Sequence, residues 1–419
     1  MKLKRIFMLS LVTTMLFAFC ACGTTPAKTE EEKKPDKEVE TSVDDKKDDE
    51  KENNEDSKTE DSKEDATKDD KPVATPEPTA TPAPTATPEP IPDGLEYKVY
   101  DDGVTIKKYK GTDANVVIPS RIDGVPVTCI GDSAFASNHD IQTVTIPNTV
   151  TVIEENAFDS CINLSSIVIP EGVTIVDDLA FYLCEKLTEV TIPSSVTYFG
   201  ASVFAMTPWI EAQYAQSDFV IVNGILIDTK DWITEAVIPA GVKVIGEAAF
   251  SNNNKLLSVV IPEGVVSIEE DAFIRCSKLT EVVIPKGVTT IGKSAFEACL
   301  ELTSVSIPDS VTSIGQFAFQ TCWGLKEVII PDSVTTLGTR IFAECKSLAK
   351  VTLGKGITSI PYEMFSACQV LESVVIPEGV TEIHYTAFTR AYQAMVLQVK
   401  PGSYAQTFAE ENGLKYENN

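Results

Sequence analysis

The sequence of 419 residues contains little histidine and lacks the short motifs that usually mark an active site. Its two histidines, His139 and His384, lie roughly ten units apart in the repeat described below, so they cannot share a site. Neither a glycine-rich phosphate loop nor a nucleophile elbow is present. We therefore predict that the protein is not an enzyme and uses no cofactor.

Positive charge is also scarce. The chain has 35 Lys and Arg against 62 Asp and Glu, which gives a formal net charge of −27. Nucleic acids and anionic membrane surfaces are bound by clustered Lys and Arg, and an acidic chain repels both. The composition therefore excludes nucleic acid as a partner.

Long apolar runs are scarce as well. A basic start precedes a mostly apolar stretch, Ile6 to Phe19, which is too short for a comfortable membrane span. We interpret residues 1–21 as a signal peptide. A small residue just before Cys22 resembles the bacterial lipoprotein signal, which is cut before a cysteine that is then lipidated. The resemblance implies a lipid anchor on Cys22 as the only membrane contact, and an ordinary secretory signal cut near Ala21 is the alternative.

Residues 22–93 have almost no large apolar side chains. Between Lys28 and Lys71 we count 20 acidic residues against 11 lysines, and such a segment cannot offset the entropy of ordering. Proline then takes nearly every second position from Thr75 to Pro90, which favours an extended polyproline II spacer. We predict a disordered acidic and Pro/Thr-rich stalk that lifts the next domain off a membrane. A Pro-rich ligand for a partner module is the alternative.

A period of 23 residues governs the rest of the chain. Phenylalanine recurs at this step from Phe135 to Phe388, except that Phe204 to Phe250 is twice the step. An Ile-Pro dipeptide recurs at the same 23-residue interval. A fixed period of this length is typical of a solenoid. We predict an α/β-type, mainly β solenoid of about a dozen coils over residues 94–419, capped at both ends, with a C-terminal cap at about 398–419.

Each unit alternates apolar and polar residues before its proline, which predicts a short strand. The residues one and three before the proline, such as Ile169 and Ile167, should face inward, and the proline ends the strand. One unit, at about 207–235, departs from this pattern. Its Asn223-Gly224 predicts a hairpin. Trp209 and Trp232 are its candidate binding side chains, although a structural variation without a binding role is the alternative.

Seven of the ten cysteines occupy one phase of the repeat, three residues after the phenylalanine. Asparagine takes this phase elsewhere, which indicates a small, buried, hydrogen-bonding slot. Within the repeats no close pair such as C-x-x-C occurs, so a zinc site lacks its usual spacing. We predict a structural ladder of free thiols and no metal site, with disulfides as the alternative. The ladder residues are Cys161, Cys184, Cys276, Cys299, Cys322, Cys345 and Cys368.

The outward face of the strands is the candidate binding surface. The position two residues before each proline has short side chains, such as Val237 and Val260. The position four residues before it is mainly Ser or Glu. This strip suits an extended or basic partner, and a solvated face that spaces its like charges is the alternative. The acidic candidates are Glu189, Glu235, Glu281 and Glu327.

The unit C-x-x-L-x-x-[VI]-x-I-P-x-x-V-x-x-I-x-x-x-A-F resembles the BspA-type leucine-rich repeat of bacterial surface proteins. The resemblance implies a leucine-rich-repeat superhelix with a parallel sheet on its concave side, and a surface adhesin. We predict a secreted, lipid-anchored, non-enzymatic surface protein that binds a protein on a host or neighbouring cell. The alternative is a structural or glycan-binding component of the bacterial envelope, in contact with the cell wall.

Overall fold

The computed structural model describes residues 89–419. The predicted signal peptide, Cys22 and nearly all of the predicted stalk lie outside the described residues. None of the helices within residues 89–419 has the length and apolar character that crossing a membrane requires.

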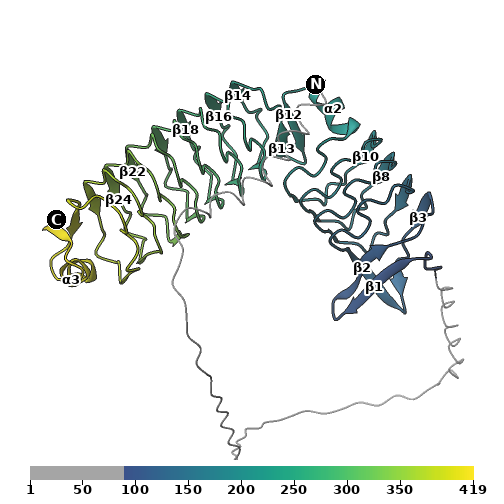
Figure 1. Cartoon of the computed structure of the whole chain (residues 1–419), viewed down its shortest axis with the longest axis horizontal. Helices are drawn as coiled ribbons and strands as arrows, with labels where there is room; N and C mark the ends of the chain where they lie inside the picture. The colour runs from purple at the N-terminus through teal and green to yellow at the C-terminus, as the bar shows by residue number, and fades with distance from the viewer. Residues whose placement is uncertain (1–88) are drawn as a thin grey trace, which may run out of the picture. The chain divides into compact units, whose positions relative to one another are not determined.

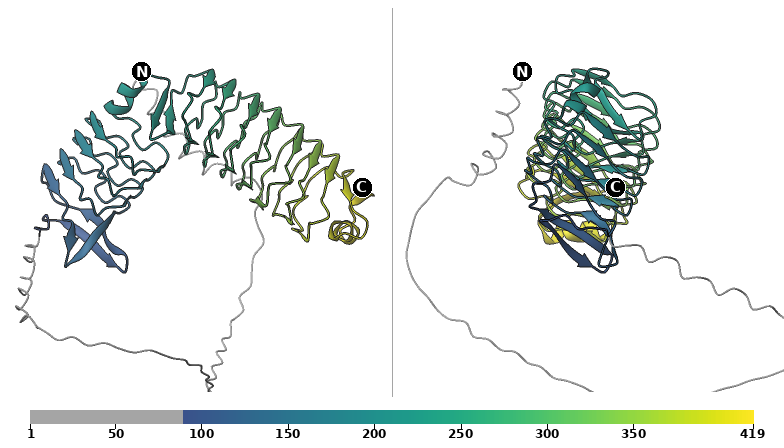
Figure 2. Two further views of the ribbon diagram at one scale, coloured as in Figure 1. Left: turned by 180° about the vertical axis from the view of Figure 1, so that it is seen from behind. Right: turned by 90° about the vertical axis from the view of Figure 1, so that its right-hand side faces the viewer.

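The chain forms a parallel β-solenoid of about 14 turns with coils of about 23 residues, so the predicted fold class is confirmed. It opens with an antiparallel hairpin, β1 (Leu95–Tyr100) and β2 (Gly103–Tyr109), followed by β3 (Asn115–Val117), β4 (Arg121–Ile122) and β5 (Val125–Ile130). The coils then stack side by side along one axis (Figure 1). Figure 2 shows the same stack from behind and from its side.

Each regular coil contributes one strand of three residues and one of two. The three-residue strands are β6 (Thr143–Thr145), β8 (Ser166–Val168), β10 (Glu189–Thr191), β14 (Glu235–Val237), β16 (Ser258–Val260), β18 (Glu281–Val283), β20 (Ser304–Ser306), β22 (Glu327–Ile329), β24 (Lys350–Thr352) and β26 (Ser373–Val375). The two-residue strands are β7 (Val152–Ile153), β9 (Ile175–Val176), β11 (Tyr198–Phe199), β15 (Val244–Ile245), β17 (Ser267–Ile268), β19 (Thr290–Ile291), β21 (Ser313–Ile314), β23 (Thr336–Leu337), β25 (Ser359–Ile360) and β27 (Glu382–Ile383).

Neighbouring coils pair in parallel with a register shift of one repeat, as in Glu281 with Ser304. The three-residue strands lie in sheets ordered β10-β8-β6-β3, β14-β16-β18-β20 and β22-β24-β26-β28-β29, the last of which ends in two longer strands, β28 (Val396–Val399) and β29 (Lys415–Asn418). The two-residue strands lie in sheets ordered β1-β2-β5-β7-β9-β11, β12-β13-β15-β17-β19-β21-β23 and β25-β27, where β12 (Phe219–Val222) and β13 (Ile225–Thr229) form a hairpin. Figure 1 shows three-residue strands such as β8, β16 and β22 along the outer edge of the solenoid, so the strands before the Ile-Pro dipeptides do not form the concave sheet that the family resemblance implies.

The unit at 207–235 replaces one coil with a helix and a hairpin. Helix α2 (Pro208–Tyr214) begins after Thr207, whose side chain accepts a hydrogen bond from the Ile210 N–H, and Pro208 fits the first helical turn. Strands β12 (Phe219–Val222) and β13 (Ile225–Thr229) then pair antiparallel. Their turn residues, Asn223 and Gly224, have φ of 52° and 80°, which is the left-handed geometry that a two-residue hairpin needs.

The C-terminal cap is built from β28 (Val396–Val399), helix α3 (Tyr404–Glu411) and β29 (Lys415–Asn418). The Ser403 side chain accepts a hydrogen bond from the Gln406 N–H at the start of the helix. Ala405, Phe408 and Ala409 of α3 are buried, so the helix covers the apolar edge of the last coil.

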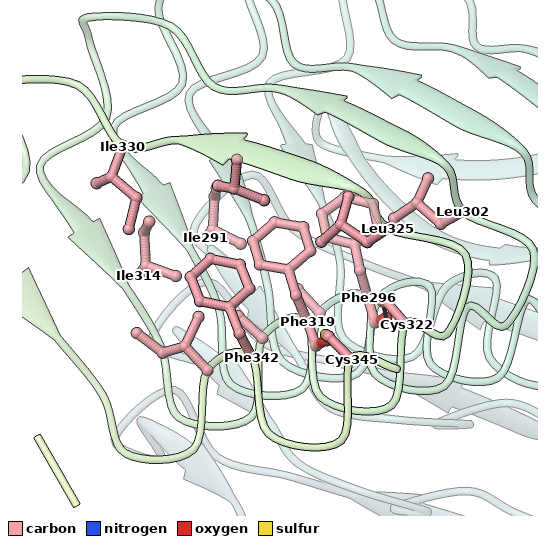
Figure 3. Close-up of a cluster of buried hydrophobic side chains, with 14 of the residues drawn as sticks. Ile291, Phe296, Leu302, Ile314, Phe319, Cys322, Leu325, Ile330, Phe342 and Cys345 are labelled. Atoms are coloured by element: carbon pink, nitrogen blue, oxygen red, sulfur yellow. Dashed lines mark hydrogen bonds between the residues drawn. The ribbon is translucent and has the colours of Figure 1, made fainter. Parts of the chain in front are cut away.

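A file of phenylalanine rings fills the core. Phe296, Phe319 and Phe342 are fully buried and lie almost parallel, with ring centroids 5.3 and 5.7 Å apart (Figure 3). Isoleucines of the two-residue strands, such as Ile291 and Ile314, pack across from them. Each of these rings is covered on its faces by the rings of the neighbouring coils, and these contacts add dispersion energy.

The turn around each phenylalanine stacks through hydrogen bonds along the solenoid axis. The N–H groups of Ser294, Phe296 and Ala298 donate to the next coil at 2.8, 2.8 and 2.9 Å. Ser294 and Ala298 have φ of 51° and 58°, and other coils place left-handed residues at the same two phases. We infer that the left-handed residues turn alternate N–H groups toward the neighbouring coil, which satisfies backbone that has no strand partner.

We predict that Phe296→Ala lowers the free energy of unfolding by about 3–5 kcal/mol, because it opens a cavity between two stacked rings. The exposed Val260→Ser serves as the control and should change it by less than about 0.5 kcal/mol. Urea unfolding followed by circular dichroism measures both. Equal effects of the two substitutions would contradict the role of the phenylalanine file.

Candidate binding surface

The outward face of the three-residue strands carries a row of exposed aliphatic side chains. In each strand the middle residue points into the core and the two flanking residues point out. Val237, Val260, Val283 and Ile329 are 57–68% exposed. We call these four residues the aliphatic row. Solvated sheet faces usually carry polar residues, so a row of this kind indicates an interaction surface.

An acidic row runs beside the aliphatic row, at the first residue of the same strands. Glu235, Glu281 and Glu327 are exposed. The registers place Ser258 between Glu235 and Glu281 and Ser304 beside Glu281, whereas Glu327 lies on β22, in the next sheet along the solenoid. We call the three glutamates the acidic row. The intervening serine keeps Glu235 and Glu281 two strands apart, about 9.6 Å instead of about 4.8 Å, which reduces their repulsion.

The structure separates the remaining candidates from these rows. Glu189 is exposed, but it lies on β10, before the irregular unit that separates it from Glu235. Trp209 is half-buried and packs on Phe204, with ring centroids 4.6 Å apart, so it extends the core. Trp232 is 49% exposed and lies three residues before Glu235, at the start of both rows.

The seven ladder cysteines are buried and free. Each Sγ donates to the carbonyl of the phenylalanine one coil earlier in the stack, as Cys322 does to Phe296 at 3.2 Å. The Nδ2 of Asn253 makes the equivalent bond to the Ile233 carbonyl at 3.1 Å. Cysteine and asparagine alternate at this phase because both are small and donate one hydrogen bond to a carbonyl inside the stack.

Burial makes these thiols poor nucleophiles. Desolvation raises the pKa of Cys276 and of Cys368 to about 12, and it raises the pKa of Cys299 well above its ordinary value. Within residues 89–419, no group of three or more His, Cys, Asp or Glu side chains is arranged to hold a metal ion. The geometry is that of a packing element.

We predict that the seven ladder thiols resist a maleimide reagent in the native protein and react fully in denaturant, because their thiolates are suppressed and covered. Cys129 is the internal control: burial and the nearby Glu154 raise its pKa to about 12 as well, but its partial exposure should let it react before the ladder thiols. Mass spectrometry of the digested protein assigns the labelled residues. Rapid native labelling of Cys299 or Cys322 would contradict a buried ladder.

A seam crosses the solenoid where the irregular unit interrupts both series of parallel strands. β11 ends one sheet and β12 begins the next. Side chains bridge the gap: Asn223 Nδ2 donates to the carbonyls of Pro193 and Val196 at 2.8 and 3.0 Å, and the Tyr198 hydroxyl donates to Glu247. Apolar side chains also join the two stacks at the seam, because Val220, Ile225 and Ile227 of the hairpin belong to the buried cluster of the N-terminal stack.

Glu247 has an unusual environment at this seam. Burial raises its pKa to about 7, the Tyr198 hydroxyl opposes that shift, and the nearby Asp178, Glu270 and Asp271 add to it. Burial also raises the pKa of Asp271 to about 6. The ammonium group of Lys293 pairs with Glu270.

We predict that Glu247→Gln reduces the loss of stability that the protein shows between about pH 5 and pH 7. The folded protein keeps the Glu247 proton up to about pH 7, whereas the unfolded chain releases it near 4.5. Because the folded state binds more protons in this window, stability falls as pH rises, and the penalty is complete above pH 7. Glutamine stays neutral, so the variant should gain in Tm relative to the natural protein as pH rises.

The exposed Glu171→Gln is the control, and its Tm should follow that of the natural protein at each pH. Calorimetry at about pH 5, 6, 7 and 8 makes the comparison. A constant Tm difference between Glu247→Gln and the natural protein would contradict the assignment.

The sequence analysis missed an aromatic cluster near the C-terminal end. Tyr362 contacts His384 edge-on with ring centroids 5.1 Å apart, and His384 stacks on Tyr385 at 4.6 Å. The Arg340 guanidinium lies over the Tyr362 ring at 5.3 Å, and Tyr385 is 78% exposed. The sequence carries one sign of this cluster. Tyr362 and Tyr385 stand three residues before the repeat phenylalanine, a position where the earlier coils have mainly charged residues.

The fold defines a stacked-coil repeat protein with an exposed sheet face. Comparison with known sequences identifies its family. The sequence profile of the BspA type leucine rich repeat region matches residues 114–225, 228–299 and 267–395, in six copies. The matched ranges cover most of the chain, and the protein belongs to this family.

Similar solved structures are leucine-rich repeat proteins of other bacteria. A leucine rich cell surface protein from Faecalibacterium prausnitzii A2-165 is 27% identical, with coverage of 77% of this chain and 97% of that one and a TM-score of 0.31. A leucine-rich repeat protein from Eubacterium ventriosum is 22% identical, with coverage of 72% and 94% and a TM-score of 0.44. The pneumococcal vaccine antigen PcpA is 18% identical, with coverage of 78% and 98% and a TM-score of 0.40. No curated protein sequence matches the chain.

Proposed function

We propose that the protein is a non-enzymatic surface protein that binds a protein partner through the aliphatic and acidic rows. One observation carries the proposal: six aliphatic side chains at one position of the repeat, the four of the aliphatic row together with Val117 and Val168, are 57–68% exposed. An exposed apolar row with a charged margin is typical of a protein interface, whose centre is apolar and whose rim is polar.

The N-terminal sequence supports a place at the cell surface. A signal peptide ending at Ala21, a lipid on Cys22 and an extended stalk would hold the solenoid away from the membrane. Two or more acyl chains give stable anchoring, because each buried methylene contributes about 0.8 kcal/mol. In this proposal the partner is a protein on a host cell or a neighbouring bacterium.

A second candidate function is binding of an envelope glycan. The observation that favours it is the cluster of Tyr362, His384 and Tyr385, whose rings are held in place by one another and by Arg340. A rigid exposed aromatic surface offers an apolar face to a ligand at low entropic cost.

We predict that the solenoid binds saturably to a protein on an array of matrix and cell-surface proteins. A triple substitution Glu235→Arg, Glu281→Arg and Glu327→Arg should weaken that binding at least tenfold. The matched control places arginine at Glu171, Glu263 and Glu378, which are equally exposed but lie in the turns after the Ile-Pro dipeptides. It should leave binding unchanged.

A glycan array run in parallel tests the second function. Saturable glycan binding that Tyr385→Ala abolishes, without protein binding, would favour the envelope role. Protein binding that the acidic-row and control variants weaken equally would contradict the rows as the binding surface.

A further inference from the structure

The two rows have a spacing that restricts the shape of their partner. Strands β14, β16, β18 and β20 belong to one hydrogen-bonded sheet, so equivalent side chains on neighbouring strands are about 4.8 Å apart. Glu235 and Glu281 stand two strands apart, at about 9.6 Å. Val237, Val260 and Val283 form a continuous apolar line beside them.

The acidic row calls for a cationic partner. Among residues 89–419, none of the ion pairs of the structure involves Glu235, Glu281 or Glu327. Lys350 stands beside Glu327 in the sheet and offsets its charge in part. The charge is therefore concentrated on Glu235 and Glu281, and a partner needs Lys or Arg side chains about 9.6 Å apart to meet both.

A polyproline II helix matches that distance. It has three residues per turn and rises about 3.1 Å per residue, so one edge returns every ~9.3 Å. A β-strand repeats one face every ~6.6 Å, and an α-helix brings a residue back to one face after seven residues, or ~10.5 Å. The polyproline form also needs no backbone hydrogen bonds, and the backbones of β14, β16, β18 and β20 are already hydrogen-bonded within their sheet.

We propose that the two rows bind a basic proline-rich segment of a partner protein in the polyproline II conformation, with Lys or Arg at every third position. This inference rests on the proposed function and names the chemistry of its partner. The segment lies along the solenoid axis. Its cationic edge meets Glu235 and Glu281, and a neighbouring edge of proline rings covers Val237, Val260 and Val283.

The protein's own proline-rich stretch does not have this chemistry. Residues 75–90 carry Glu77 and Glu89 and no Lys or Arg, so the acidic row repels them. A second copy of the solenoid face is disfavoured for the same reason, since two acidic rows would face each other.

Fluorescence polarisation with labelled peptides tests the inference on the full chain. The probe is (Pro-Pro-Lys)5, and three matched peptides isolate its features: (Gly-Ser-Lys)5 keeps charge and spacing without the rigid helix, (Pro-Pro-Pro-Lys)5 shifts the lysines out of phase, and (Pro-Pro-Glu)5 reverses the charge. We expect (Pro-Pro-Lys)5 to bind at least tenfold more tightly than each of the others.

Protein variants locate the site. The double substitution Glu235→Arg and Glu281→Arg, and separately Val237→Ser with Val283→Ser, should each weaken (Pro-Pro-Lys)5 at least tenfold. Arginine at Glu171 and Glu263 is the control and should have no effect. Circular dichroism verifies that each variant keeps its fold, and both target sites are exposed.

Each contrary result has a defined meaning. Equal binding of (Pro-Pro-Lys)5, (Gly-Ser-Lys)5 and (Pro-Pro-Pro-Lys)5 overturns the polyproline inference and leaves only charge attraction. Tight binding of a peptide of residues 75–90 overturns the inference in favour of the protein's own proline-rich stretch. Dimerisation of the natural protein that the valine variant loses overturns it in favour of a second copy of the chain. If no peptide binds while an array protein still depends on the acidic row, the inference fails and the proposed function stands. If the array protein ignores the row, both fail.

Discussion

Every feature of this solenoid depends on the contact between one coil and the next. A single coil has only five residues in strands and cannot bury its apolar edge alone. At a spacing of about 4.8 Å, the ring of Phe319 covers that of Phe296, the thiol of Cys322 reaches the Phe296 carbonyl, and the N–H of Phe296 reaches the next coil. The same spacing between coils therefore buries the apolar rings, provides an acceptor for the thiol and pairs the backbone N–H.

The same spacing leaves the outward positions free to vary. The middle residue of each three-residue strand is fixed by the core, whereas its neighbours contact only solvent and the equivalent residues of adjacent coils. A row of valines or an alternation of Glu and Ser therefore costs the fold little. The surface can acquire a pattern for a partner without disturbing the phenylalanine file.

The sequence predicted the fold because each 23-residue period corresponds to one coil, and stacked coils need the same side chains at equivalent positions. The Ile-Pro strands and the hairpin at Asn223-Gly224 each follow from local signals, and the structure has both. The contact of Tyr198 with Glu247 could not be predicted, because the two residues are 49 apart in the sequence and out of phase with the repeat. The half-burial of Trp209 depends likewise on where α2 packs, which no local pattern encodes.

The seam also divides the hydrophobic interior. One cluster of buried side chains ends at Ile227 in the hairpin, and the other begins at Leu226 of the same strand. Rings are stacked on each side of the seam, but the series from Phe135 ends at Trp209 and the series from Phe219 starts anew. A pulling force along the solenoid axis therefore acts on two separately packed blocks in series. We expect one block to unfold and extend while the other stays folded.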